Sequence, residues 1–390
     1  MKKSLIALAV MAAAGAASAQ SSVTVFGIVD ATIAYGKGSD GASSKTQLTN
    51  SGYNSSRIGF RGTEDLGGGL AASFWLEGSL GNDDGTAGQR IPVGNQNGLQ
   101  APNDGAGLVF NRRSTVSLSG NWGEVRLGRD YTPTFWNLTI FDPFGTNGTG
   151  TTLTLVAPAG GLGTAANALV PVGTRGVIVR ASNDIGYFLP ANLGGLYGQV
   201  NVWLGENLRN ASVGNVSTEN DGRGGGVRVG YGAGPFNVAI AWAQTKYDAT
   251  PVNGAVGGPT GDFTTWNIGG QWDFGMAKLM GHYSSETRSN SAFNAETDGK
   301  GWLIGALVPV GAGEIRVAYS TYKIDLANGA EPEAKQLALG YVHNLSKRTA
   351  LYTTVARVKN EGGSAVALNG AQAVVNNNST GFDLGIRHSF

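Results

Sequence analysis

The sequence contains no cysteine and only three histidines among its 390 residues. Without cysteine, the chain has no disulfide bonds, no thiolate metal sites and no cysteine nucleophile. Charged residues make up only 14% of the sequence, against about 25% in soluble globular proteins. The formal net charge of +1 indicates neither a basic nucleic-acid-binding protein nor an acidic tail. We therefore expect no metal site, no cofactor and no nucleic-acid partner.

Long apolar runs are also missing once the first nineteen residues are set aside. Two lysines, a short apolar core and an Ala-Ser-Ala cleavage site at 17–19 are typical of a signal peptide. We expect residues 1–19 to be removed and residues 20–390 to form a single domain. The apolar core is too short for a membrane span of about 20 residues. If this exported protein spans a membrane, it must do so as a closed barrel, because backbone polar groups need partners there.

The sequence is rich in glycine, with 63 residues, and in short segments where apolar and polar residues alternate. In one such segment, Ile58 and Phe60 point to one side of a strand while Arg57 and Arg61 point to the other. We find no convincing helix. Sixteen strands are expected, near 23–36, 54–63, 69–79, 110–120, 122–131, 178–190, 195–206, 223–232, 235–247, 262–273, 275–287, 299–309, 313–323, 333–344, 348–358 and 380–390.

The connections between these strands alternate strictly between short and long. Seven are short and rich in glycine, proline and asparagine, and eight are long, among them 287–299 and 323–333. If the last strand closes against the first, the fold is all-β: a 16-stranded antiparallel transmembrane β-barrel with short periplasmic turns and long extracellular loops. Aromatic residues near the strand ends are expected to form two interfacial girdles: Phe26, Tyr35, Phe60, Tyr187, Tyr197, Trp242, Trp266, Trp272, Tyr283, Trp302, Tyr319, Tyr352 and Phe390.

Five segments stand out at both ends and in the middle of the chain: 21–30, 56–70, 111–131, 340–352 and 385–390. They resemble the general Gram-negative porins, and most of all the β-proteobacterial branch of neisserial and comamonad anion-selective porins. The resemblance implies a sixteen-stranded barrel in a homotrimer, with a third long loop folded inward to narrow the channel. It also implies that Phe390 is part of a signal read by the outer-membrane barrel-insertion machinery.

A barrel of sixteen strands is too wide for side chains to fill, so inward-facing residues can be charged at low cost. Lipid-facing charges, in contrast, cost about 2–4 kcal/mol at the midplane. Five arginines lie on the strand side opposite to their apolar neighbours and are expected to face the lumen: Arg57, Arg61, Arg113, Arg126 and Arg180.

The resemblance implies which of the charged residues form the pore constriction. It places a basic cluster at Arg57, Arg112 and Arg180 and acidic residues across from it at Glu77 and Asp142. Strand parity selects Arg113 where the resemblance selects Arg112. Both assignments stay open, because the two residues lie at a strand start, where the pleat need not hold.

The third long loop, residues 132–177, is the expected constriction loop. Its first 43 residues, 132–174, contain a single charged side chain, Asp142. If one carboxylate faces three guanidiniums at the narrowest point, the channel attracts anions and repels cations. The alternative is that these arginines only brace the barrel by pairing with carboxylates: Glu64, Asp65, Glu77 or Asp130.

These features predict a porin, a passive channel for small hydrophilic solutes that prefers anions. Outer-membrane lipid and lipopolysaccharide are the expected surroundings. The sequence shows no nucleophile–base constellation, so we do not expect an enzyme. His282 has the inward parity and is expected to be a solvated residue of the wall. The alternative function is a surface adhesin or structural barrel whose long loops bind partners.

Overall fold

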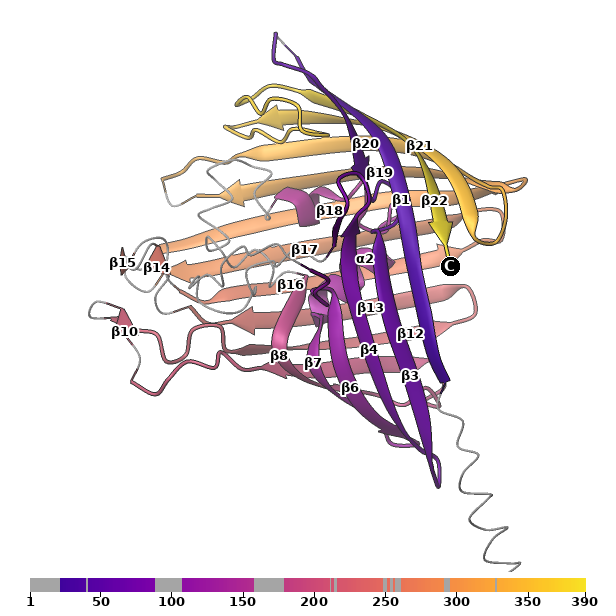
Figure 1. The fold of residues 1–390 in the computed structure, drawn as a ribbon. Coiled ribbons are helices and arrows are strands. Elements are labelled where there is room, and N and C mark those ends of the chain that lie inside the picture. The colour runs from indigo at the N-terminus through magenta and orange to yellow at the C-terminus, as the bar shows by residue number, and fades with distance from the viewer. Residues whose placement is uncertain are drawn as a thin grey trace, which may run out of the picture.

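The protein is described here by a computed structural model that covers residues 22–39, 41–87, 107–157, 179–210, 212–213, 216–247, 251–252, 255–256, 261–290, 295–326 and 328–390. The expected signal peptide lies outside these residues. Sixteen strands form one antiparallel barrel (Figure 1): β1 (Ser22–Gly38), β3 (Arg57–Gly67), β4 (Leu70–Gly81), β6 (Arg113–Gly120), β7 (Gly123–Tyr131), β8 (Arg180–Phe188), β9 (Leu196–Trp203), β12 (Gly224–Ala233), β13 (Phe236–Thr245), β16 (Phe263–Asp273), β17 (Lys278–Asn290), β18 (Ala295–Val310), β19 (Gly313–Asp325), β20 (Glu333–Asn344), β21 (Thr349–Glu361) and β22 (Ser379–Ser389).

Each barrel strand pairs with the next one along the chain, and the last strand closes on the first. β1 is antiparallel to β3 on one side and to β22 on the other. At this seam, the backbone N–H of Gly27 donates to the carbonyl of Phe390, and the N–H of Phe390 donates to the carbonyl of Gly27. The ring is therefore completed by the last residue of the chain, as the expected closure of strand sixteen requires.

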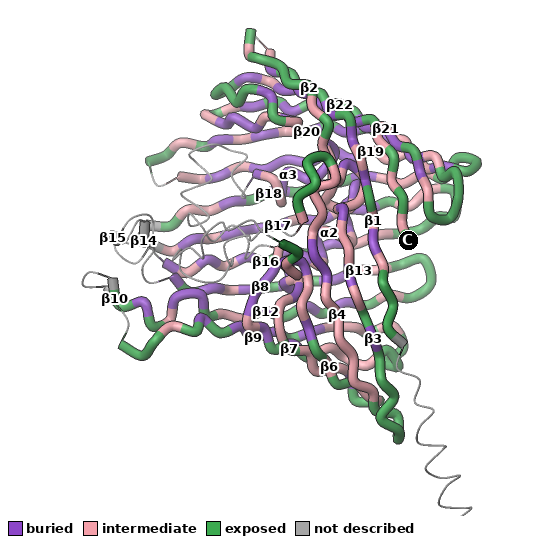
Figure 2. Tube along the Cα trace, in the orientation of Figure 1, coloured by how far each residue is buried: buried purple, intermediate pink, exposed green. Residues whose placement is uncertain are grey.

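Buried and exposed residues alternate along the barrel strands (Figure 2), as the apolar–polar alternation of the sequence predicts. In β1, Ile33 is 53% exposed on the outer surface, whereas Asp30 and Thr32 are buried on the inner side. The expected aromatic girdle needs a correction at Phe26, Tyr197 and Tyr352. They share the inward parity of their strands and contact polar lumen residues instead of lipid.

The expected difference between short turns and long loops holds for most connections, but not for all of them. β17 ends at Asn290 and β18 begins at Ala295, while β19 ends at Asp325 and β20 begins at Glu333. The expected loop 287–299 is thus largely strand and the expected loop 323–333 is shortened at both ends, because alternation continues beyond the barrel rim. Short strand pairs also occur in the loops: β2 (Lys45–Asn50) on β1, β5 (Thr86–Ala87) on β4, β10 (Ser212–Val213) with β11 (Val216–Ser217), and β14 (Pro251–Val252) with β15 (Ala255–Val256).

The third long loop contains two helices that the sequence analysis did not expect: α2 (Pro133–Ile140) and α3 (Leu153–Val156). Thr132 is the N-cap of α2, and its side chain accepts the backbone N–H of Phe135. Pro133 at the first position suits a helix start. No helix in the described part of the chain is long and apolar enough to cross a membrane.

The loop folds inward, and its two helices pack on the inner wall, α2 on the strands that follow β8 around the barrel and α3 on strands farther around it. Helix α2 contacts β12, β13 and β16, and α3 contacts β18, β19 and β20 (Figure 1). Asn137 of α2 donates to the carbonyl of Ala239 at 3.0 Å. Phe141 lies so close to Gly269 that a Cβ there would collide with its ring. The inward-folded third loop therefore rests on a wall shaped to receive it.

Candidate functional site

Five residues meet on the inner wall where β3, β4, β6, β7 and β8 adjoin. Arg112 donates from Nε to Oε1 of Glu77 at 2.6 Å, and Arg57 Nε lies 3.9 Å from the same oxygen. The hydroxyl of Tyr131 accepts hydrogen bonds from Nη2 of Arg112 and from Nη2 of Arg180, each at 3.1 Å. We call this group the Glu77 cluster; it comprises Arg57, Glu77, Arg112, Tyr131 and Arg180.

Tyr131 connects the Glu77 cluster to the third loop. The Arg180 guanidinium lies over its ring, 4.6 Å from the centroid. The same ring packs on Phe135 at 4.7 Å and on Trp136 at 5.2 Å, both of helix α2. A guanidinium stacked on an aromatic ring is held in a fixed plane. The first turn of the inward-folded loop therefore helps to hold the arginines in place.

The Glu77 cluster carries an excess of positive charge, because three guanidiniums share one carboxylate. The side chain of Arg57 is 27% exposed, whereas those of Arg112 and Glu77 are only 10% exposed. Arginine stays protonated at any physiological pH. A unit charge at ~6 Å contributes about 3 kcal/mol at an effective dielectric of ~20. The cluster is thus a site where a small anion is favoured and a cation is not.

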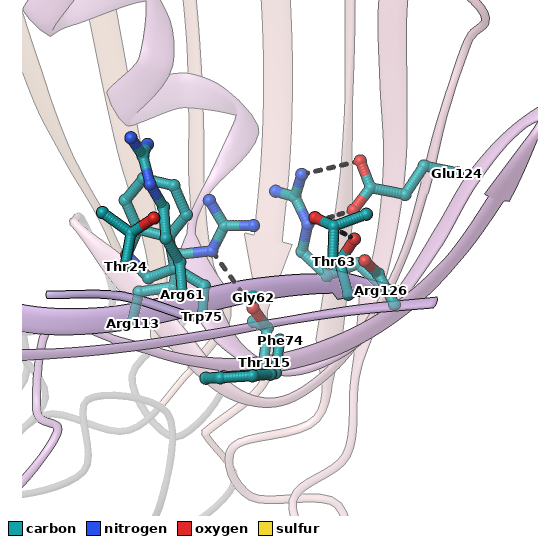
Figure 3. A pocket seen from close by; sticks show the side chains of 12 residues that line it. Thr24, Arg61, Gly62, Thr63, Phe74, Trp75, Arg113, Thr115, Glu124 and Arg126 are labelled. Carbon is teal, nitrogen blue, oxygen red and sulfur yellow. Dashed lines mark hydrogen bonds and ion pairs between the residues drawn. The ribbon is translucent and has the colours of Figure 1, made fainter. Parts of the chain in front are cut away.

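A second group of arginines, comprising Arg61, Arg113 and Arg126, lies on the same wall (Figure 3). Arg113 Nε lies 3.5 Å from Asp130 Oδ2, and its guanidinium stacks over Trp75 at 4.6 Å. Arg126 pairs with Glu124 at 2.9 Å and with Asp130 at 2.5 Å. Both Arg112 and Arg113 therefore face inward, but they join different groups, which resolves the disagreement between parity and resemblance.

The carboxylates are not placed as the sequence analysis expected. Glu77 lies within the basic cluster, on β4, rather than across from it. Bracing of arginines by Glu77 and Asp130 is present, as the alternative interpretation predicted. Glu64 and Asp65, in contrast, form no ion pair among the described residues. Both lie at the end of β3 that leads into the short turn.

Asp142 braces the third loop instead of facing the arginines. Its carboxylate accepts the backbone N–H groups of Phe144 at 2.9 Å, and of Thr146 and Thr152 at 3.1 Å each. Burial raises the pKa of this carboxyl from 3.8 to about 6, although the three N–H donors oppose the shift. The expectation was wrong because the carboxylate satisfies its own loop's backbone, which parity and composition do not reveal.

The raised pKa of Asp142 makes the third loop less stable as the pH rises. Between pH 4 and 6 the folded loop holds a proton that the unfolded chain releases, so stability falls over this window. A shift of about two pKa units corresponds to roughly 3 kcal/mol. We expect amide exchange at Phe144 and Thr152 to be faster at pH 7 than at pH 5, beyond the intrinsic effect of pH. In Asp142→Asn this excess should vanish, and its persistence would contradict the assignment.

Several arginines near the site were not assigned from the sequence. Arg129 has the parity of the outward-facing Leu127, but a bulge interrupts β7 between Gly128 and Asp130. Its Nε donates to the carbonyl of Asn111 and its Nη1 to Ser182 Oγ, both at 2.7 Å. Single-residue parity cannot reveal a bulge, although a glycine within a strand is a signal for one.

Elsewhere on the inner wall, two further arginines contact the loops. Arg228 of β12 donates to Asn137 Oδ1 of α2 at 2.5 Å. Arg316 of β19 donates to the Tyr53 hydroxyl at 3.2 Å. The alternation of residues 314–323 does place Arg316 on the polar side of its strand. The alternation therefore indicated that Arg316 faces inward, but it did not indicate the contact with Tyr53.

His282 is another residue whose surroundings differ from the expectation. It is buried rather than solvated, and its Nε2 lies 2.7 Å from Thr154 Oγ1 of helix α3. The inward parity was correct, but the third loop covers this part of the wall. His282 therefore belongs to the attachment of the loop.

Comparison with known proteins places this geometry among outer-membrane channels. A model of the Gram-negative porin family matches residues 5–363. Outer membrane porin protein 32 of Delftia acidovorans is 40% identical, with both chains covered completely. An outer membrane porin protein of Bordetella pertussis is 29% identical, again over the whole of both chains.

Solved structures show the same architecture. An anion-selective porin from Comamonas acidovorans matches with a TM-score of 0.76 and 36% identity, over 95% of this chain and 100% of that one. OmpT of Vibrio cholerae matches with a TM-score of 0.62 over 95% of this chain and 98% of that one. At 14% identity, the second likeness concerns the fold alone.

Proposed function

This chain belongs to the Gram-negative porin family and is an outer-membrane porin, and from that premise we propose that small hydrophilic solutes pass through it by diffusion with a preference for anions. The observation that carries the preference is the ratio of three guanidiniums to one carboxylate in the Glu77 cluster. The similar Comamonas acidovorans protein is itself described as anion-selective.

Transport in this proposal needs no cofactor, no nucleotide and no conformational cycle. A hydrated anion enters the lumen, exchanges part of its hydration for the donors of Arg57, Arg112 and Arg180, and leaves along its gradient. Salt screens such charges with a Debye length of about 8 Å at physiological strength. The preference is therefore exerted where the third loop brings the solute close to the wall. The relatives are channel proteins, and we propose no enzymatic activity.

The remaining expectations belong to the same proposal. Residues 1–19 act as a cleaved export signal, and residues 20–390 form one barrel domain with 132–177 as its constriction loop. Three copies assemble in a membrane that contains lipopolysaccharide. One similar structure, OmpT of Vibrio cholerae, is described in a trimer form. Phe390 serves the barrel-insertion machinery as the end of the closing strand.

The adhesin alternative predicted a plugged lumen and loops rich in charge. The third loop contradicts the second point, since Asp142 is the single charged residue in 132–174. Similarity to porins along the whole chain leaves this alternative without support.

Zero-current potentials in planar bilayers test the proposed preference. In a KCl gradient, the zero-current potential of the natural channel should have the sign expected when chloride permeates more readily than potassium. Glu77→Gln keeps the size of the side chain and removes the only negative charge of the Glu77 cluster, so its potential should move further toward that sign. Glu331→Gln, with a side chain 61% exposed in a loop, is the matched control. A potassium-like potential in the natural channel would refute the proposal.

A further inference from the structure

The second group of arginines surrounds a recess in the inner wall, of about 400 Å³, which opens to the lumen (Figure 3). It lies on the short-turn side of the Glu77 cluster, because Arg61 follows Arg57 along β3 and Trp75 precedes Glu77 along β4. The Trp75 Nε1–H donates to Glu77 Oε2 at 3.2 Å. The recess and the Glu77 cluster are thus neighbouring sites on one wall.

Two guanidiniums approach the Trp75 ring from the strands on either side of β4. Arg61 of β3 lies 5.2 Å from the ring centroid, and Arg113 of β6 lies 4.6 Å from it. Arg61 also lies 5.3 Å from the ring of Phe26. Stacking on aromatic faces fixes the planes of both guanidiniums. Their edge donors are therefore oriented before a ligand arrives.

Arg61 differs from the other arginines of the recess in having no anionic partner. It is exposed, and within the described ranges it forms neither an ion pair nor a hydrogen bond. Arg126, in contrast, is held by both oxygens of Glu124 and by Asp130. The group as a whole contains three guanidiniums, those of Arg61, Arg113 and Arg126, and two carboxylates, those of Glu124 and Asp130. One positive charge is left over, and it resides on Arg61.

The rest of the lining is rich in hydroxyl groups, which are donors and acceptors for a polar solute. Thr63 and Ser73 lie beside Arg61, and their hydroxyl oxygens are 3.0 Å apart. Thr24, Thr115 and Ser117 complete this side of the lining. A ligand with a hydroxyl group as well as a negative charge therefore finds complementary partners in this recess.

We propose that this recess is a binding site for small hydroxylated monocarboxylates, in which Arg61 and Arg113 hold the carboxylate and the Thr63–Ser73 pair holds a hydroxyl. The single excess charge favours a monoanion over a dianion, because a second carboxylate would face Glu124 and Asp130. The inference rests on the proposed anion-permeable channel and specifies a solute class that it retains.

L-lactate and propionate test this site, because they have the same charge and differ by one hydroxyl group. Each acid is titrated against the chloride current of the reconstituted channel, and the half-blocking concentration is measured. We expect lactate to block at a lower concentration than propionate. Arg61→Gln should raise the half-blocking concentration of both acids about tenfold, as loss of a charge-assisted hydrogen bond predicts. Thr63→Val combined with Ser73→Ala should remove the difference between the two acids.

Arg357→Gln is the matched control, since this exposed arginine lies on the outer side of β21. Arg61→Lys, which keeps the charge, should retain more lactate block than Arg61→Gln. Equal block in Arg61→Gln and Arg357→Gln would overturn the proposal, as would stronger block by succinate than by lactate. The zero-current potential of the same channels in KCl reports the anion preference separately. A normal potential with unaltered block rejects the recess alone, whereas a potassium-like potential rejects the proposed function.

Discussion

Arg57→Glu combined with Arg180→Glu is expected to convert the channel from anion to cation preference. The change replaces two positive by two negative charges around Glu77, so that Arg112 alone remains to offset three carboxylates. A unit charge at ~6 Å contributes about 3 kcal/mol at an effective dielectric of ~20. Because this distance is shorter than the Debye length of about 8 Å, salt screens only part of that energy. In a KCl gradient the zero-current potential should change sign.

The control for this double variant applies the same charge change away from the inner wall. Arg209 and Arg348 are exposed, one in a long loop and one in a short turn, so Arg209→Glu with Arg348→Glu should leave the sign unchanged. Because Arg180 is only 8% exposed and stacks on Tyr131, folding must be checked separately. Arg57→Gln with Arg180→Gln, which adds no charge, should give an intermediate potential. An unaltered potential in a folded double-Glu variant would exclude these residues from selectivity.

Deletion of residues 132–174 and their replacement by a short Gly-Ser linker should raise the single-channel conductance about twofold or more, because a sixteen-stranded barrel without its loop keeps a wide aqueous lumen. The loop packs on β12, β13, β16 and β18–β20, so its removal clears the space between opposite walls. Anion preference should weaken at the same time. Arg180 and Arg112 then lose the support that Phe135 and Trp136 give to Tyr131.

Removal of residues 209–217 from the loop between β9 and β12 provides the comparison for the deletion. That segment bears the β10–β11 hairpin and lies outside the site, so conductance should stay close to that of the natural channel. A third-loop deletion with equal or lower conductance would show that residues 132–174 do not narrow the channel.

The barrel itself was predictable from the sequence, because a strand has a period of two residues and lipid permits few charges. The parity of Ile58 and Phe60 was sufficient to turn Arg57 and Arg61 inward, and the structure agrees. The same rule placed Arg113 and Arg126 on the inner wall. Local alternation carries this information, so no knowledge of distant contacts was needed.

Residues outside the regular pleat were not predictable in this way. Arg112 lies one residue before β6, and Arg129 lies beside a bulge, so parity gives no reliable direction for either. Helix α2 is surrounded by the barrel and shows no polar face that would mark its period. The resemblance placed Asp142 opposite the arginines, but the partners of its carboxylate are backbone groups up to ten residues away.

The seam between β1 and β22 also determines whether a shortened chain can close into a barrel. The hydrogen bonds of Gly27 reach Phe390, directly after the closing strand β22. Any product that stops early leaves β1 with an unsatisfied edge, which hydrocarbon does not tolerate. A polypeptide without β22 therefore cannot close the ring, because β1 and β21 would both lose the strand that they pair with.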